Sequence, residues 1–276
     1  MTGNLSNFVK VSLTLRTHSG KPTQFRARFT INQTTLPLFF KHLALGLAVI
    51  PLLNRVAPAQ QPTPRTIIFL DPAHGGPDTG AHLPNNLLEK DVTLAFAARL
   101  RAILSASGFA VISTHETDPT VSFSTDQRAE IGNHAHPTAC LILHATSSGT
   151  GIHIVTSALT PNTFEDPHAA IPWNSAQAAS IPQSLNLANE IGLALQNAKL
   201  PVILSRASLR PLDNLTCPAV AIEIASLDPT DSSAPPITDA TYQQNIAKAI
   251  AAGLTSWRSR TAPPAGATTP GAGAAK

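Results

Sequence analysis

The sequence predicts an α/β fold, a sandwich in which a central, mostly parallel mixed sheet of about six strands is flanked by helices. Short apolar runs that suit buried strands alternate along the chain with longer segments whose apolar residues recur at helical spacing. That alternation is typical of a mostly parallel sheet covered by helices. Hydrophobic residues make up 43% of the 276 residues and charged residues 13%, which is enough apolar material for one core.

The strand-like segments are short and apolar. The first, at 66–70, ends in Asp71-Pro72, which suits a buried strand followed by a turn. In sheets of this type, functional groups gather at the carboxyl ends of the strands. The residues that follow these segments are therefore the first candidates for a site. Further strands are expected at 109–113, 140–143, 202–204 and 219–224.

Four segments have the apolar spacing of helices. In the first, Val92, Phe96 and Leu100 lie four residues apart, and Gly108 is placed to end the helix. Together with the strands, these segments predict a folded domain over 66–260. The other helices are expected at 127–133, around 187–195 and at 246–257.

The positive charge of the chain is unevenly distributed. The net charge is +3 and the pI is about 9.1. Residues 1–59 contain seven basic and no acidic residues, whereas the remainder contains 12 basic and 16 acidic residues, a balance of −4. An acidic domain is a poor match for a phosphate backbone, so a nucleic-acid partner is not expected.

The basic N-terminal segment is predicted to direct export. An uncharged apolar run at 43–53 follows Lys41 and precedes the small-residue triplet 57–59 (APA), as in a secretory signal peptide. A buried helix and an uncleaved signal anchor are the alternatives, but the run is short for a membrane span and Pro51 interrupts it. The expected divisions are a leader at 1–59, a linker at 60–65, the folded domain at 66–260 and a disordered tail at 261–276. We therefore expect an exported protein of the periplasm or cell envelope, in contact with a membrane only through an uncleaved leader.

Three residues near the predicted strand ends could hold a metal. His74 lies in a glycine-containing turn, 71–76 (DPAHGG), Glu89 precedes the first helix, and His144 ends the strand at 140–143. Taken singly, a histidine after a strand is more often structural, and Glu89 could be an acid favoured by the helix dipole. Taken together, two histidines and a carboxylate, with a fourth position left for water, form a known catalytic zinc set.

Glu223 is the candidate acid/base. It lies between apolar residues of a predicted strand, next to Ile222 and Ile224. A lone charge is costly to bury, so a carboxylate in this position is expected to be paired or functional. Together with the metal set, it favours a hydrolase.

From about Ile67 to Trp257, the sequence resembles the zinc N-acetylmuramoyl-L-alanine amidases of the AmiA/AmiC type. The resemblance implies Zn²⁺ bound by His74, Glu89 and His144, no further cofactor-binding residues, and Glu223 as the catalytic acid/base. It also implies a peptidoglycan substrate, cut at the amide between N-acetylmuramic acid and L-alanine. The matching segments are 68–76 (IFLDPAHGG), Asp78, Gly80, 89–92 (EKDV), 117–118 (TD), 121–123 (VSF), Arg128, Asn133, 143–145 (LHA) and 218–223 (PAVAIE).

The sequence departs from the family pattern at positions that are not metal ligands. Thr146 stands where an asparagine is common, and His115 stands where an arginine is usual. After the glutamate, Ala225, Ser226 and Pro229 replace the usual Gly-Phe and later Asn. These changes bear on substrate positioning rather than on the metal set.

Two cysteines and six further histidines complete the candidates. Cys140 and Cys217 could pair in an oxidising compartment, but we expect buried free thiols. The remaining histidines have no ligand-like spacing. Within 66–260 they are His82, His115, His134, His136, His153 and His168.

Two alternatives to the amidase stay open from sequence. One is a zinc peptidase acting on wall peptides, because the metal set alone does not distinguish the two activities. The other is a non-catalytic relative that binds peptidoglycan or regulates its turnover, which the altered loop after Glu223 favours. The expected protein is a monomer, and an activator protein is left open as a partner.

Overall fold

The computed structural model describes residues 66–162, 170–228 and 234–261. The predicted leader and linker and, except for Thr261, the predicted tail lie outside these residues. Pro229 and His168 lie outside them too. Within the described ranges, no helix has the length and apolarity needed to cross a membrane.

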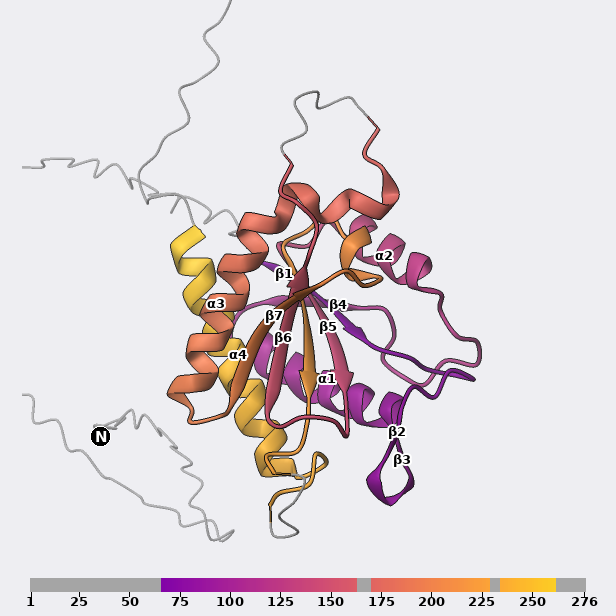
Figure 1. Ribbon diagram of the computed structural model, residues 1–276, viewed down its shortest axis with the longest axis vertical. Helices are drawn as coiled ribbons and strands as arrows, with labels where there is room; N and C mark the ends of the chain where they lie inside the picture. The colour runs from indigo at the N-terminus through magenta and orange to yellow at the C-terminus, as the bar shows by residue number, and fades with distance from the viewer. Residues whose placement is uncertain (1–65, 163–169, 229–233, 262–276) are drawn as a thin grey trace, which may run out of the picture. The chain divides into compact units, whose positions relative to one another are not determined.

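The fold is built on a six-stranded mixed sheet with the strand order β4-β1-β5-β8-β6-β7 (Figure 1). From β4 to β8 each strand is parallel to its neighbour, whereas β6 runs antiparallel to β8 and parallel to β7. The predicted α/β class and mostly parallel sheet are therefore confirmed. The strands are β1 (Ile67–Pro72), β4 (Ala110–Ser113), β5 (Ala139–Ala145), β6 (Ile152–Ser157), β7 (Val202–Ala207) and β8 (Ala219–Ile224).

Alternating side chains of the strands divide the core between the two faces of the sheet, as the pleat requires. Leu70 belongs to the larger cluster, which includes residues of α1, α3 and α4, whereas Phe69 belongs to a smaller cluster that includes residues of α2 and η3. The helices are α1 (Glu89–Ala106), α2 (Thr125–His134), α3 (Ile181–Asn197) and α4 (Ala240–Thr261), with the 3₁₀ turns η1 (Pro84–Asn86), η2 (Trp173–Ser180) and η3 (Leu212–Asn214). A small hairpin of β2 (His82–Leu83) and β3 (Leu87–Leu88) precedes α1.

Local chemistry explains where two of the helices begin. Ser124 and Gln127 form a reciprocal capping box, so α2 begins at Thr125. α1 begins at Glu89, which places this residue in the first turn of the helix rather than before it. A carboxylate there is favoured by the partial positive charge of the helix N-terminus.

The expectation of free thiols was wrong, because Cys140 and Cys217 form a disulfide with their Cα atoms 6.1 Å apart. Parallel pairing of β5 with β8 places Cys140 opposite Ala219, two residues beyond Cys217. The sheet therefore brings together two cysteines that are 77 positions apart in sequence, a proximity that spacing alone could not reveal.

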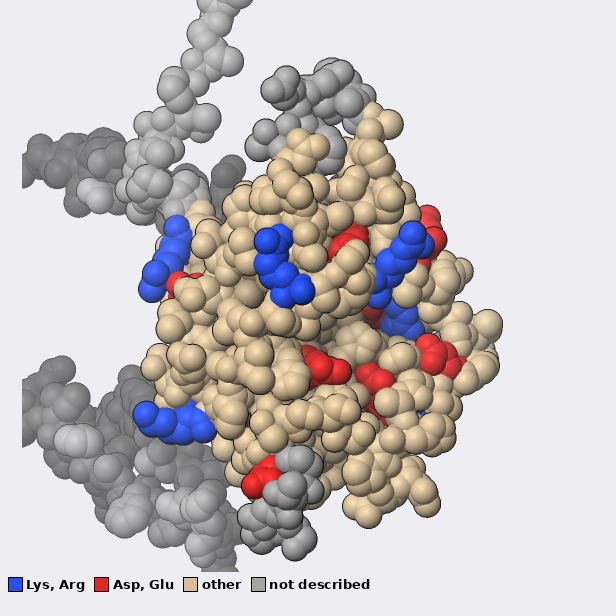
Figure 2. Space-filling view, viewed as in Figure 1, with Lys and Arg blue, Asp and Glu red and all other residues tan. Residues whose placement is uncertain are grey.

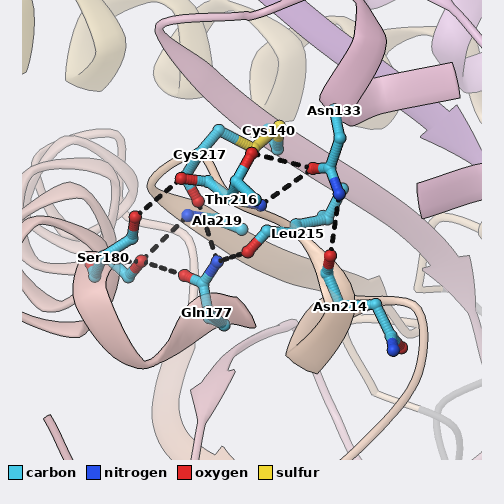
Figure 3. Close-up of a disulfide and its surroundings, with 10 residues drawn as sticks. Asn133, Cys140, Gln177, Ser180, Asn214, Leu215, Thr216, Cys217 and Ala219 are labelled. Carbon is cyan, nitrogen blue, oxygen red and sulfur yellow. Dashed lines mark hydrogen bonds between the residues drawn. A yellow bond between two sulfur atoms is a disulfide. The ribbon is translucent and has the colours of Figure 1, made fainter. Parts of the chain in front are cut away.

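Polar contacts hold the segment that contains the second cysteine (Figure 3). The side-chain amide of Gln177 donates to the carbonyl oxygens of Leu215 and Cys217, at 2.6 and 2.8 Å. On the other side, Asn133 Oδ1 accepts from the backbone N–H of Thr216 at 2.8 Å. The approach to β8 is thereby fixed from both η2 and α2.

Candidate metal centre

His74 lies on the turn that leaves β1, in a left-handed backbone conformation with φ of 68°. Such a conformation is costly for a residue with a side chain and persists only where the surroundings enforce it. Gly75 and Gly76 continue the turn with positive φ, as the glycine pair in the sequence suggested. The turn directs the His74 side chain toward the first residue of α1, Glu89.

The guanidinium group of Arg128, on α2, anchors this turn. Its guanidinium donates to Asp71 Oδ1 at 2.7 Å, to the carbonyl of Pro72 at 2.9 Å and to the carbonyl of His74 at 2.5 Å. The side chains of Arg128 and Asp71 are 5% and 1% exposed, so the pair is buried. A planar guanidinium with several donors can hold three acceptors at once, which fixes where β1 ends and the turn begins.

A second anchor comes from the loop before α2. Asp118 accepts from the backbone N–H of Gly76 and from Lys90 Nζ, both at 2.7 Å. Lys90 also donates to the carbonyl of Gly76 at 2.8 Å. The Lys90 ammonium lowers the pKa of Asp118. The turn is therefore held by contacts to α1 and to the loop before α2.

Asp78 orients the His74 ring. His74 Nδ1 lies 3.0 Å from both carboxylate oxygens of Asp78, and Ser122 Oγ accepts from the backbone N–H of Asp78. The contact with Glu89 raises the pKa of His74, against the opposing effect of burial, and the contact with Asp78 adds to the rise. A carboxylate on one ring nitrogen fixes the tautomer and leaves Nε2 to face the centre.

Glu89 links the two histidines. Its Oε2 lies 3.1 Å from His74 Nε2 and accepts from the backbone N–H of Ala81 at 2.9 Å. Its Oε1 lies 2.8 Å from His144 Nδ1 and 3.2 Å from the backbone nitrogen of Ala145. Burial would raise the pKa of Glu89, but the contacts with His144 and His74 outweigh it and hold the pKa well below its usual range.

Gly80 is needed for this close approach. A Cβ atom at Gly80 would lie 2.5 Å from the His74 ring and 2.8 Å from the side chain of Glu89. Its φ of +66° is also a conformation that side chains rarely adopt. The centre therefore has no room for a larger residue here.

The structure brings the three predicted ligands together. His74, Glu89 and His144 each offer one ligand atom, and these atoms lie within 4.8 Å of one another. Two imidazole nitrogens and one carboxylate oxygen are donors that zinc accepts, so the group is consistent with a metal-binding site. Single residues from the turn after β1, from α1 and from β5 thus converge at one edge of the sheet.

Glu223 lies beside this group on β8, directly opposite His144 in the parallel register. Its side chain is 38% exposed, so the sequence argument from a buried lone charge was wrong. Because side chains alternate along a strand, Ile222 and Ile224 point into the core on the other face of the sheet. Glu223 points away from them, toward the face that carries His144.

His153 was not predicted as part of the site. It lies on β6, opposite Glu223 in the antiparallel register, with Nδ1 3.4 Å from Glu223 Oε2. The signal that could have revealed it is the alternation of Ile152, Ile154 and Thr156, all buried, with the less buried His153. That pattern predicts a strand, but its single histidine has no ligand-like spacing.

Acidic side chains gather on this face of the molecule, over the carboxyl ends of β5 and β8 (Figure 2). A His-Glu-His group at the carboxyl edge of an α/β sheet, with a partly exposed glutamate beside it, is consistent with the class of metal-dependent hydrolases. Comparisons with known proteins narrow this class. Residues 68–256 match the Amidase_3 family model, N-acetylmuramoyl-L-alanine amidase. The chain belongs to this family of cell-wall hydrolases, and its described domain is an N-acetylmuramoyl-L-alanine amidase.

Individual relatives agree with this assignment. An N-acetylmuramoyl-L-alanine amidase of Mycobacterium tuberculosis is 25% identical over 238 residues, covering 76% of this chain and 93% of that protein. A germination-specific amidase of Bacillus subtilis is 52% identical over 61 residues, which are 22% of this chain and 25% of that protein. The match therefore spans a quarter of one relative and nearly all of the other.

A solved structure shares the fold. The CwlD amidase of Clostridioides difficile, determined in complex with the GerS lipoprotein, superposes with a TM-score of 0.54 at 22% sequence identity. The match covers 71% of this chain and all of that chain.

Proposed function

We propose that the protein hydrolyses the amide bond between N-acetylmuramic acid and L-alanine in peptidoglycan, with zinc bound by His74, Glu89 and His144. The observation that carries the proposal is the convergence of these three side chains within 4.8 Å, next to Glu223, in an amidase domain. When bound there, zinc would lower the pKa of its water ligand and polarise the scissile carbonyl.

The residues around the ligands have defined tasks in this proposal. Asp78 holds the proton of His74 at Nδ1, so that Nε2 is free to bind the metal. The backbone N–H groups of Ala81 and Ala145 each donate to one oxygen of Glu89 and fix the orientation of its carboxylate. These contacts orient the ligand atoms before an ion binds.

Glu223 is proposed to move the proton. Its carboxylate takes a proton from the attacking water, whose oxygen adds to the carbonyl carbon of the amide, and returns it to the amide nitrogen as the C–N bond breaks. The products are a lactyl carboxylate on the sugar and a free amino group on L-alanine. With 38% of its side chain exposed, Glu223 can meet both substrate and water.

One residue that departs from the family pattern, Ala225, is anchored by hydrogen bonds. Ala225 is buried, and its N–H donates to the carbonyl of Gly151 at 2.8 Å. Its own carbonyl accepts from the hydroxyl of Tyr242 at 2.8 Å. The segment directly after Glu223 is therefore held in place without the usual Gly-Phe pair, which favours an active enzyme over a non-catalytic relative.

The proposal is tested by zinc content and wall hydrolysis of purified variants. The wild type is expected to carry about one zinc per chain. Glu223→Gln should keep the metal and lose turnover, whereas His74→Ala should lose both. Glu130→Gln, an exposed glutamate on α2, is the matched control and should behave like the wild type. Zinc binding without wall hydrolysis by the wild type would instead support the non-catalytic relative.

The proposed location is the periplasm or cell envelope, reached through the predicted leader. The disulfide supports an extracytoplasmic enzyme, because disulfides persist in oxidising compartments. An activator protein is proposed as a partner, in keeping with the structure of CwlD in complex with a lipoprotein. Fractionation of cells that express the tagged chain tests the location, and a cytoplasmic pool of mature protein would contradict it.

A further inference from the structure

His153 extends a row of polar side chains across the sheet. The strand register places it opposite Glu223, and Glu223 opposite His144. These three residues lie on neighbouring strands, β6, β8 and β5, and share one face because paired residues point to the same side. The proposed reaction uses His144 and Glu223 and gives no task to His153.

The surroundings of its two ring nitrogens differ. Nδ1 faces Glu223 Oε2 at 3.4 Å. Nε2 is buried and has no hydrogen-bond partner within the part of the chain that the structure describes. A proton on Nε2 would leave a buried donor unsatisfied and would turn the Nδ1 lone pair toward a carboxylate oxygen. The surroundings therefore favour a proton on Nδ1, which faces the carboxylate.

The backbone around the ring limits its movement. A Cβ atom at Gly149 would lie 2.6 Å from His153 Cε1, so the backbone at Gly149 lies close against the imidazole ring. Two hydrogen bonds join this turn to the segment after β8, from Gly151 N–H to Ser226 O at 2.9 Å and from Ala225 N–H to Gly151 O at 2.8 Å. These backbone hydrogen bonds therefore fix the position of the turn beside His153 relative to the segment that follows Glu223.

We propose that His153 is a positioning residue for Glu223, an inference that rests on the proposed function. The Nδ1–H group donates to Glu223 Oε2 when substrate is bound. Oε1 is then left to take the proton from the attacking water and to return it to the amide nitrogen. The separation of 3.4 Å is longer than a direct hydrogen bond. Contacts of this kind often shorten only in the complex with substrate.

The kinetic test compares His153→Ala with His153→Asn in the full chain, with soluble muramyl-peptide fragments as substrate. His153→Ala should lower kcat about 10–100-fold, as loss of an orienting partner does in metal sites, and change KM by less than about threefold. His153→Asn should restore kcat to within about fivefold of wild type, because the asparagine amide nitrogen can take the place of Nδ1–H. Ser205→Ala on β7 is the control and should leave both constants unchanged.

Zinc content and the urea unfolding midpoint distinguish positioning from a structural role. Both should match the wild type in His153→Ala and His153→Asn. An unchanged kcat in His153→Ala, an effect on KM alone, or an asparagine variant no better than alanine would overturn the proposal. So would a loss of kcat that merely tracks a loss of zinc or of stability.

A spectroscopic test does not depend on turnover. ¹⁵N-resolved NMR of the histidine rings, with His153 assigned from the spectrum of His153→Asn, should show the proton on Nδ1. A proton on Nε2 would overturn the inference even if the enzyme is active. If the wild type fails to hydrolyse the fragments, the proposed function fails on its own, and the tautomer still decides whether His153 faces Glu223 as a donor.

Discussion

At the scale of single residues, the buried pair of Arg128 and Asp71 determines where the turn that carries His74 begins. The guanidinium holds the carboxylate and two backbone carbonyls, those of Pro72 and His74, at distances of 2.5–2.9 Å. Removing one partner of a buried pair leaves the other charge uncompensated, which costs far more than the net contribution of the intact pair.

Arg128→Ala should therefore destabilise the protein by about 3–5 kcal/mol and lower its affinity for zinc, because the His74 turn loses its anchor. Arg210→Ala is the matched control. Its pair with Asp126 spans 3.8 Å with both side chains 55% exposed, so its loss should cost at most about 1 kcal/mol. Urea unfolding and metal titration measure both effects. Equal costs for the two variants would contradict the anchoring role.

Gly80→Ala should abolish zinc binding, because its Cβ would collide with the His74 ring and the Glu89 side chain. Gly108→Ala provides a control with a similar backbone but open space. Its φ is +84° and nothing lies within 4 Å of the added atom, so only backbone strain of about 1–2 kcal/mol is expected, with zinc binding intact. Metal analysis of the two variants separates collision from strain, and full zinc occupancy in Gly80→Ala would disprove the collision.

At the scale of elements, α4 supports the segment that follows β8. The hydroxyl of Tyr242, in the first turn of α4, donates to the carbonyl of Ala225 at 2.8 Å. Burial raises the pKa of Tyr242 to about 12. The ionised form is therefore disfavoured in the folded state relative to the unfolded chain, where the pKa of tyrosine is about 10.

Because the folded pKa is raised, this contribution to stability is complete below about pH 10 and is lost as the pH rises toward about 12. Tyr242→Phe should be less stable than wild type by about 1 kcal/mol at neutral pH, through the lost hydrogen bond. The difference should shrink over the alkaline range. Urea unfolding of both proteins at several pH values checks this, and a difference that stays constant up to about pH 12 would refute the assignment.

Sequence patterns predicted most elements because each carries its own local signal. The strand at Ala219–Ile224 has the predicted bounds, since it is a continuous apolar run broken only by Glu223. β6 was missed because its run, Ile152–Ser157, contains a histidine and two hydroxyl residues. The exposure of Glu223 was misjudged for a related reason, since its apolar neighbours line the opposite face of the strand.

At the scale of the whole molecule, the fold brings together residues that are remote in sequence. The metal set could be predicted because its residue types form a known zinc group and because the surrounding motifs resemble a family. The disulfide and the contact between His153 and Glu223 could not, since both depend on which strands are neighbours in the sheet. Spacing along the chain contains no information about that order.

The disulfide closes a long loop across this sheet. In the chain-entropy model, a bridge between residues 77 positions apart stabilises by about 4.5 kcal/mol, and measured values range over about 2–5 kcal/mol. The double variant Cys140→Ala/Cys217→Ala should lose stability in this range and keep the zinc site, because pairing of β5 with β1 and β8 still holds His144 in register. Urea unfolding and metal analysis measure both quantities. Loss of zinc with no loss of stability would contradict this prediction.

The most direct test of the central claim is the chemical identity of the products released from purified peptidoglycan by the zinc-loaded protein. Mass spectrometry with N-terminal labelling should find two products. One is free stem peptides that begin with L-alanine, and the other is glycan strands whose lactyl groups carry free carboxylates. The Glu223→Gln protein, with its zinc retained, should release neither. Cleavage within the stem peptide, or release of these products at an unchanged rate by the Glu223→Gln protein, would contradict the assignment of the reaction or of its acid/base.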